Sequence, residues 1–203
     1  LAVDRQELVD TVMGGEAVVS CDTPVAPTDQ YRHNMSCGQN IAEAKKLLKE
    51  AGYPNGIEMV IHVSTKEPTW PTIAEVIQQQ VAKAGIKVEI KMTPSKSYWK
   101  ETWMKKDVAM TRWNERSADS VLHEVYHSSA KWNESYYKSS DFDKNLADAR
   151  GELDFTKRKT LYQKAQHTLW EQSGTMIPYH VSKLVVTNSR VKNLDEVEVF
   201  SIQ

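Results

Sequence analysis

The middle of this chain alternates between strand and helix patterns, and this alternation restricts the fold more than any other feature of the sequence. Residues 57–63 form a short apolar run and residues 86–92 alternate apolar and polar side chains, so both predict strands. Between them, residues 71–84 repeat apolar side chains at helical spacing, with a proline in the first turn. A short helix over 95–106 and a third strand over 107–113 extend the series. We therefore predict an α/β fold in which three parallel neighbouring strands form a βαβαβ sheet flanked by helices.

The segments before and after this run are mainly helical by pattern. Amphipathic spacing predicts helices over 1–13, 41–51, 140–153 and after Asp154, and an apolar, β-rich stretch follows at 176–186. The first five residues already have the pattern of a helix interior, so we expect the chain to be a fragment excised from a longer protein. A chain of 203 residues can bury one sizeable core or two small ones.

The charge balance argues against one class of partner. The chain has 26 basic and 27 acidic residues, and its basic clusters are short. Nucleic-acid binders usually concentrate a basic excess on one face, so we expect no nucleic-acid partner. No segment approaches the roughly 18 consecutive apolar residues that a membrane helix needs.

The two cysteines bracket an irregular segment. Cys21 and Cys37 enclose a stretch rich in proline, aspartate, asparagine and serine. This arrangement fits a disulfide formed in an oxidising compartment, and two unpaired thiols are the alternative. The spacing matches no zinc knuckle, so we expect no metal at these cysteines.

Several segments, taken together, resemble one known family. Residues 42–56, AEAKKLLKEAGYPNG, are similar to the signature AKxLLxEAGYPNG of the family 5 bacterial extracellular solute-binding proteins, the dipeptide, oligopeptide and nickel-binding group. Residues 2–9, 80–88 and 177–180 are similar to the family motifs AIDRQxLV, QLxKxGIKV and IPLYH. The matches follow the order of the family along nearly the whole chain.

This resemblance implies a fold and a function. The fold would be a class II periplasmic-binding-protein-like lobe, with residues 1–203 as a single domain, the distal lobe of a two-lobed protein whose first lobe is absent from this chain. The protein would be the substrate-binding component of an ABC transporter, capturing a peptide or other small solute in a cleft between lobes. The implied partners are the permease subunits and a peptide, an opine-like conjugate or an oligosaccharide. We further expect a monomer in the periplasm, or outside the cell on a membrane anchor in a Gram-positive source, with no catalytic residue and no cofactor.

The resemblance also implies where the solute binds. In this family the ligand contacts of the distal lobe follow the third strand, at the carboxyl end of the sheet. Trp113 matches the tryptophan of the family, with Asn114 beside it, and Asp119 falls on the position of a conserved DP pair although Ser120 replaces the proline. We expect the loop 114–120 to open onto an exposed edge that resembles half a cleft, with Trp113 at its wall.

Two further aromatic residues are candidates for the same surface. Trp132 and Tyr136 carry rings that can stack on sugars or other flat ligands. The alternative is that they belong partly to the core.

One position departs from the family pattern. Peptide binders of this family carry an aspartate three residues after the tryptophan, where it pairs with the α-ammonium group of the peptide, but this chain has Arg116. A guanidinium cannot accept a hydrogen bond from an ammonium group, and the two like charges repel. We therefore expect the site to favour a carboxylate, phosphate or hydroxyl-rich group. The alternatives are that Glu115 compensates through a register shift, or that Arg116 is a solvated loop residue.

One short motif suggests a different kind of protein. The segment His123–His127 reads HEVYH and matches the HExxH pattern in which two histidines bind zinc and the glutamate acts as a general base. A third ligand would have to be Glu134 or Glu152. A zinc-dependent hydrolase is therefore the alternative function, and a chance match of a short pattern is the simpler interpretation. We assign no metal ligand.

Overall fold

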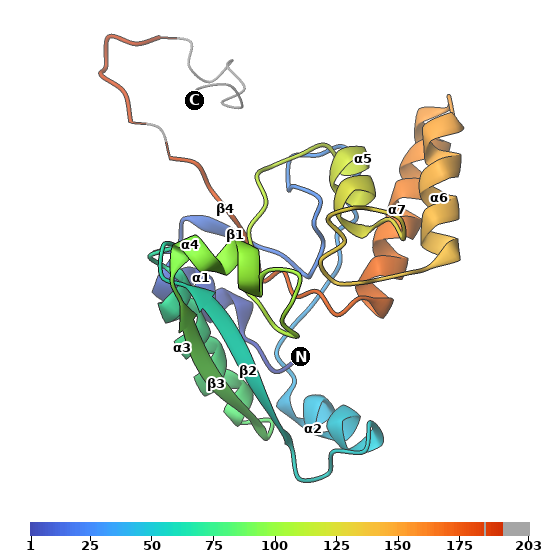
Figure 1. The fold of residues 1–203 in the computed structure, drawn as a ribbon. Coiled ribbons are helices and arrows are strands. Elements are labelled where there is room, and N and C mark those ends of the chain that lie inside the picture. Colours follow the sequence, from blue (N-terminus) through green and yellow to red (C-terminus); the bar gives the residue numbers. More distant parts are fainter. Residues whose placement is uncertain (185, 193–203) are drawn as a thin grey trace.

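The computed structural model describes residues 1–184 and 186–192, and it is a mixed α/β structure as the sequence predicts (Figure 1). The elements, in which η denotes a π-helical turn, are in chain order α1 Arg5–Val12, β1 Ala17–Val19, α2 Ile41–Glu50, β2 Ile57–Ser64, α3 Trp70–Ala82, β3 Ile86–Thr93, α4 Ser95–Ser97, η1 Tyr98–Thr102, α5 Ala118–Val121, η2 Leu122–Tyr126, α6 Ser140–Gly151, α7 Phe155–Gln172 and β4 Tyr179–Val181. No helix of this described part is long and apolar enough to span a membrane.

Strands β2 and β3 form the parallel pair that the sequence predicts. They pair in register from Ile57 opposite Ile86 to Ser64 opposite Thr93, and α3 makes the crossover and packs against both strands. Two glycines allow the strands to meet closely where they begin. Gly56 has φ +87°, and a Cβ atom there would lie 1.9 Å from the carbonyl oxygen of Gly85, so this position requires glycine.

The prediction of a third extended strand over residues 107–113 is wrong. The chain touches β2 only at a parallel bridge between His62 and Ala109, where the backbone of His62 bonds to Val108 and Met110. The polar residues that follow lack an alternating apolar face, and the chain leaves the sheet as a loop. The sheet therefore consists of β2 and β3 with one bridging residue.

A second small sheet joins distant parts of the chain. β1 pairs antiparallel with β4, with Ala17 opposite Val181 and Val19 opposite Tyr179. The predicted apolar stretch at 176–186 contributes only three strand residues to it, and residue 185 lies outside the described part. The sequence pattern gave no signal for β1.

Two predicted helices differ from the structure. The first helix begins at Arg5, because the Asp4 side chain accepts a hydrogen bond from the backbone N–H of Glu7 and caps it, so residues 1–3 are not a helix interior. The predicted helix 95–106 ends at Thr102, where the π-turn η1 is closed by a bond from Trp103 N–H to the Tyr98 carbonyl. Buried Tyr98 explains this position, because its hydroxyl bonds to backbone carbonyls of His62 and Met110 beside the sheet.

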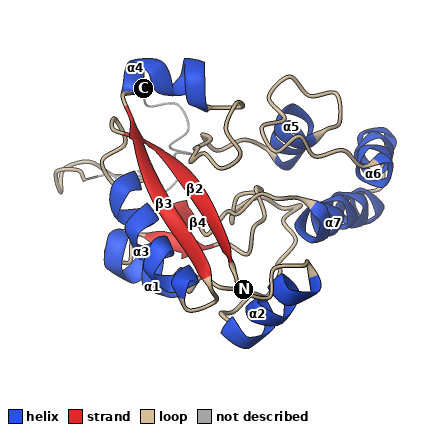
Figure 2. Ribbon diagram, turned by 60° about the horizontal axis from the view of Figure 1, so that its bottom comes forward, coloured by secondary structure: helices blue, strands red, loops and turns tan. Residues whose placement is uncertain are grey.

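The described residues bury two separate hydrophobic clusters. The sheet cluster gathers side chains from α1, α3, β2 and β3, with Leu8, Val63 and Ala74 fully buried. The helical cluster gathers side chains from α5, η2, α6 and α7, including Phe142 and Leu146. Figure 2 shows these two groups of elements side by side, with the strands and α3 on one side and α5–α7 on the other.

A disulfide closes the long loop that follows β1. The sulfur atoms of Cys21 and Cys37 are 2.03 Å apart, and the Cα atoms are 5.5 Å apart. Within the enclosed segment, Val25 is buried in the helical cluster and Tyr31 packs against it. The bridge therefore anchors a segment that has no helix or strand of its own.

Candidate functional site

The loop after the sheet brings two indole rings onto one carboxylate. The indole N–H of Trp113 donates to one oxygen of Glu134 over 2.9 Å, and the indole N–H of Trp103 donates to the other oxygen. Trp103 ends the π-turn η1, Trp113 follows the bridge to β2, and Glu134 lies in the loop before α6. This one carboxylate therefore fixes the relative positions of three segments.

Glu134 is the residue of this arrangement that sequence reasoning missed. The sequence suggested it only as a third zinc ligand, a role that its two indole donors do not support. The only available signal was an acidic residue two positions after Trp132 in a chain with six tryptophans. No spacing rule connects such a residue with Trp103 and Trp113.

Arg116 lies against two of the tryptophans. Its guanidinium carbon is 5.5 Å from the ring centroid of Trp113 and 5.9 Å from that of Trp132, which is within the range of cation–π attraction. Its Nη1 donates to Glu124 over 2.6 Å, while its Nε is buried with no hydrogen-bond partner among the described residues. The arginine side chain remains 32% exposed. Trp113, Arg116 and Trp132 therefore form one surface, which we call the aromatic cluster together with Trp103 and Glu134.

The predicted residues Tyr136 and Asn114 lie on loops next to the aromatic cluster. Tyr136 is 66% exposed, and its hydroxyl donates to the carbonyl of Met104, which ties the Tyr136 loop to the segment after η1. Asn114 is exposed on the loop between Trp113 and Arg116. The neighbouring Asn133 is buried and holds the Tyr136 loop in shape by bonds to the backbone of Tyr137.

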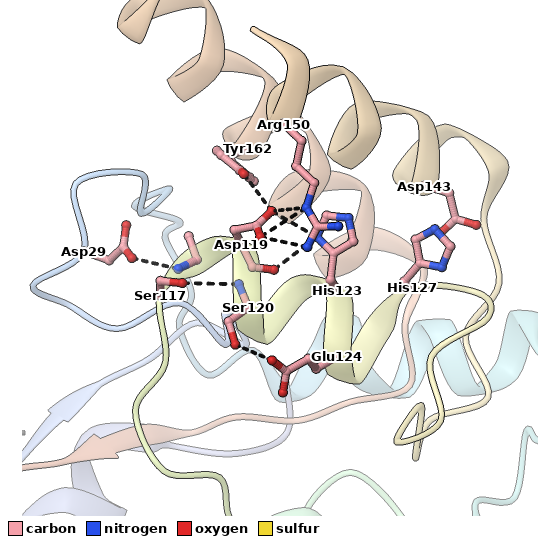
Figure 3. Close-up of polar contacts among 11 residues, drawn as sticks. Asp29, Ser117, Asp119, Ser120, His123, Glu124, His127, Asp143, Arg150 and Tyr162 are labelled. Atoms are coloured by element: carbon pink, nitrogen blue, oxygen red, sulfur yellow. Dashed lines mark hydrogen bonds and ion pairs between the residues drawn. The ribbon is translucent and has the colours of Figure 1, made fainter. Parts of the chain in front are cut away.

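Asp119 is engaged elsewhere. Arg150 donates to both of its carboxylate oxygens, the Tyr162 hydroxyl donates to one of them, and the Nδ1 atom of His123 lies 3.1 Å away (Figure 3). Burial opposes ionisation, but the hydrogen bonds from Arg150 and Tyr162 and the charges of His123 and Arg150 outweigh it and lower the pKa of Asp119. The structure therefore does not bring Asp119 to the aromatic cluster. Its carboxylate instead connects α5 to α6 and α7.

The HEVYH segment does not assemble a zinc site. The rings of His123 and His127 stack 5.7 Å apart, and burial lowers the pKa of His123. Glu124, the base of the proposed motif, accepts from Arg116 and from the Ser120 hydroxyl. Glu152 accepts from a backbone N–H two residues away. Across residues 1–184 and 186–192, no group of three histidine, cysteine, aspartate or glutamate side chains could hold a metal ion, so no observation favours the hydrolase.

Part of the aromatic cluster is accessible to solvent, because Trp132 is 38% exposed and the Arg116 side chain is 32% exposed. Two shallow hollows lie away from it, one of about 370 Å³ between α6 and α7 and one of about 480 Å³ beside α3 and β3. Chemically, the cluster offers indole rings and one guanidinium, and the partly exposed carboxylate of Glu124 lies beside it, paired with Arg116. Such groups can stack on and ion-pair with a solute.

Comparisons with known proteins identify the family of this chain. A family model described as bacterial extracellular solute-binding proteins, family 5 Middle, matches residues 1–133. The glutathione-binding proteins GsiB of Salmonella choleraesuis (strain SC-B67) and Escherichia coli (strain K12) are each 30% identical to this chain, over 93% of it and 39% of their own length. The chain therefore spans about two fifths of the length of these curated relatives.

Solved structures share the fold over a similar span. The periplasmic binding protein DppA from Helicobacter pylori, in complex with the peptide STSA, superposes with a TM-score of 0.75 at 29% identity, over 90% of this chain and 38% of that one. HbpA2 from Haemophilus parasuis superposes with a TM-score of 0.77 at 27% identity, over 89% and 38%. The expected periplasmic-binding-protein-like fold is thereby confirmed.

Proposed function

The chain belongs to the bacterial extracellular solute-binding proteins of family 5, and on that premise we propose that it is the distal lobe of the substrate-binding component of an ABC transporter. Residues 1–203 act as one domain that contacts the solute, and the first lobe supplies the opposite wall of the cleft. The single observation that carries this proposal is the family match over residues 1–133, which includes the sheet and the loop of the aromatic cluster.

The position and shape of the aromatic cluster support this role. Trp113 follows the point where the chain leaves the parallel sheet, and open α/β sheets bind ligands beyond the carboxyl ends of their strands. Trp132 and Arg116 of the cluster are partly exposed to solvent, and a second surface would enclose a solute bound to them. A two-lobed protein provides that surface by hinge closure.

The solute is a small peptide or a peptide-like compound. Relatives named as glutathione-binding proteins and a structural neighbour in complex with a peptide support this class. Opine-like conjugates and oligosaccharides are finer alternatives that stacking on Trp113 and Trp132 would also accommodate. The solute surface consists of Trp113, Asn114, Arg116 and Trp132, with Tyr136 at its margin.

The remaining parts of the proposal concern the setting of the protein. It works as a monomer, outside the cytoplasmic membrane, and delivers its solute to the permease subunits of the transporter without altering it. The bond between Cys21 and Cys37 supports an oxidising compartment, because disulfides persist there.

Native mass spectrometry of the full-length protein, purified without denaturation, tests this function. We expect a stoichiometric adduct with the mass of a short peptide or peptide conjugate, which is released on unfolding. An oligosaccharide adduct would change the solute class. A protein with no adduct, and with no thermal shift from any peptide or sugar, would contradict solute capture.

A further inference from the structure

The surface of the aromatic cluster carries an ion pair whose two members are both accessible. Arg116 Nη1 and Glu124 Oε2 are 2.6 Å apart, and the two side chains are 32% and 39% exposed. Glu124 comes from the π-turn η2, eight residues after the arginine. Its other oxygen accepts from the Ser120 hydroxyl, which fixes the carboxylate beside the guanidinium (Figure 3 shows the Ser120 contact). A positive and a negative group therefore lie side by side at the surface.

Both members of the pair retain binding capacity. The pair uses only Nη1 of the guanidinium, so the edge formed by Nε and Nη2 has no hydrogen-bond partner among the described residues. Nη2 of that edge can donate a charge-assisted hydrogen bond to a carboxylate. Each oxygen of Glu124 has one donor and can accept a second. Nε is buried in this structure, so Nη2 is the atom of this edge that an incoming carboxylate can reach.

Charge compensation decides which solute group fits best. An exposed ion pair contributes little net stability, so a solute can separate the two partners at small cost. A solute group with only a carboxylate binds Arg116 but lies beside the negative charge of Glu124. A group with only an ammonium binds Glu124 but lies beside the positive charge of Arg116. A group that carries both charges satisfies both residues at once.

The two tryptophans restrict this group further. The guanidinium carbon lies against both Trp113 and Trp132, whose ring centroids are 5.7 Å apart, so the two indoles cover part of it from one side. Ionic contacts are stronger where water is partly excluded. We propose that Arg116 and Glu124 form a subsite for a zwitterionic α-amino-acid headgroup, in which one carbon atom carries both the ammonium and the carboxylate. This inference rests on the proposed function and names the part of the solute that this lobe binds.

Two isomeric dipeptides provide the test. In γ-glutamyl-glycine the ammonium and a carboxylate share one carbon, whereas in α-glutamyl-glycine the carboxylate of the glutamyl residue lies on its side chain. The isomers have the same mass and the same charges, and they differ in which carboxyl group of the glutamyl residue is free and which forms the peptide bond. We expect calorimetry with the full-length protein to give at least about tenfold tighter binding of the γ isomer, the size of one charge-assisted hydrogen bond.

Variants separate recognition from a structural role. Arg116→Gln and Glu124→Gln should each weaken binding of the γ isomer about tenfold and bring the ratio of the two affinities close to one. Glu124→Gln should bind N-acetyl-γ-glutamyl-glycine, which lacks the ammonium, more tightly than the wild type does, because the competing negative charge is gone. A merely structural Glu124 would not produce that gain. Arg112→Gln is the matched control, because Arg112 lies on the same loop, pairs with Glu67 and is 58% exposed, and it should leave the ratio unchanged.

The outcomes distinguish this inference from the proposed function. Equal binding of the two isomers by the wild type, with no effect of either variant, overturns the inference and leaves solute capture intact. Binding of other peptides but of neither isomer also overturns the inference alone. Failure to bind any peptide overturns both the inference and the peptide class of the proposed function.

Discussion

The sheet cluster and the helical cluster are stabilised in different ways. In the sheet cluster, backbone pairing in register and an apolar helix face account for the arrangement of β2, β3 and α3. In the helical cluster, polar side chains connect elements that are far apart in the sequence. Asp119 joins α5 to Arg150 of α6 and Tyr162 of α7. The comparison teaches that backbone strand pairing aligns β2 and β3 in the sheet cluster, whereas the elements of the helical cluster have no strand pairing with one another and are oriented by individual side-chain contacts.

Gln166 on α7 is the clearest example of such a contact. It is 1% exposed, its amide nitrogen donates to the carbonyl of Tyr31, and its oxygen accepts from the N–H of His33 and the hydroxyl of Thr23. One side chain thus holds the disulfide-closed loop against the helical cluster. The aromatic cluster lies between the two hydrophobic clusters, because residues 108–110 pack on the sheet cluster and Trp113 packs on the helical one.

The largest expected effect tests whether the two clusters unfold separately. Phe142→Ala removes a fully buried ring from the helical cluster and should lower the free energy of unfolding by about 3–5 kcal/mol. Hydrogen exchange should accelerate in α6 and α7 and stay slow in β2 and β3. Ile73→Ala, its counterpart in the sheet cluster, should show the reverse pattern. Equal acceleration in both regions for both variants would show a single cooperative unit and break the comparison.

The disulfide should have the next largest effect. Replacing Cys21 and Cys37 by serine opens a loop of about 15 residues, which should lower the free energy of unfolding by about 3 kcal/mol in the chain-entropy model. Urea unfolding with and without reductant measures the loss, and reductant should not affect the double variant. Full reactivity of both thiols in the native protein without reductant would contradict the bond.

The buried amide of Gln166 gives a smaller, polar effect. Gln166→Leu keeps a similar size but leaves the Thr23 hydroxyl, the His33 N–H and the Tyr31 carbonyl without this partner, so stability should fall by about 2 kcal/mol. Gln163→Leu, on the same helix with one contact to the Arg32 carbonyl, is the control and should have a smaller effect. No loss of stability in Gln166→Leu, measured by urea unfolding, would show that Gln166 acts only through its packing.

The smallest expected effect depends on pH. The pKa of Asp119 is lowered in the folded protein, so its contribution is fully present above the unfolded value of about 3.9 and is lost as the pH falls through the folded value. Asp119→Asn should therefore cost about 1 kcal/mol at pH 6, because the carboxylate and Arg150 are partly exposed. The difference from the wild type should shrink as the pH falls below the unfolded value. A difference that is constant from pH 6 to pH 2 would show that ionisation of Asp119 does not matter.

The sequence predicts those parts of the fold that depend on periodicity. The apolar spacing of residues 71–84 and the alternation of residues 86–92 located α3 and β3, and the helix expected after Asp154 is α7, which the Asp154 side chain caps. The prediction of the third strand failed because it was inferred from a local apolar run. Whether a segment joins the sheet depends instead on its backbone pairing with the neighbouring strand. Here only Ala109 bridges to β2.

The candidate site was only partly predictable for a related reason. Trp113 and Arg116 were found through the resemblance to the family, as a match to its tryptophan and as a departure from its aspartate three residues later. The partners Glu134 and Glu124 were not found, because hydrogen bonds over 21 and 8 residues follow from the tertiary arrangement and leave no periodic signal. Asp119 matched a family position, but the contacts that occupy its oxygens come from α6 and α7.

The central claim is that the aromatic cluster is the solute-contacting surface of this lobe. Hydrogen exchange of the full-length protein, with and without the solute that copurifies with it, tests this claim most directly. We predict protection of residues 111–116 and 132–136 on solute binding, with little change in the outer turns of α6. Unchanged exchange in both of these segments, together with protection elsewhere in the lobe, would contradict the account.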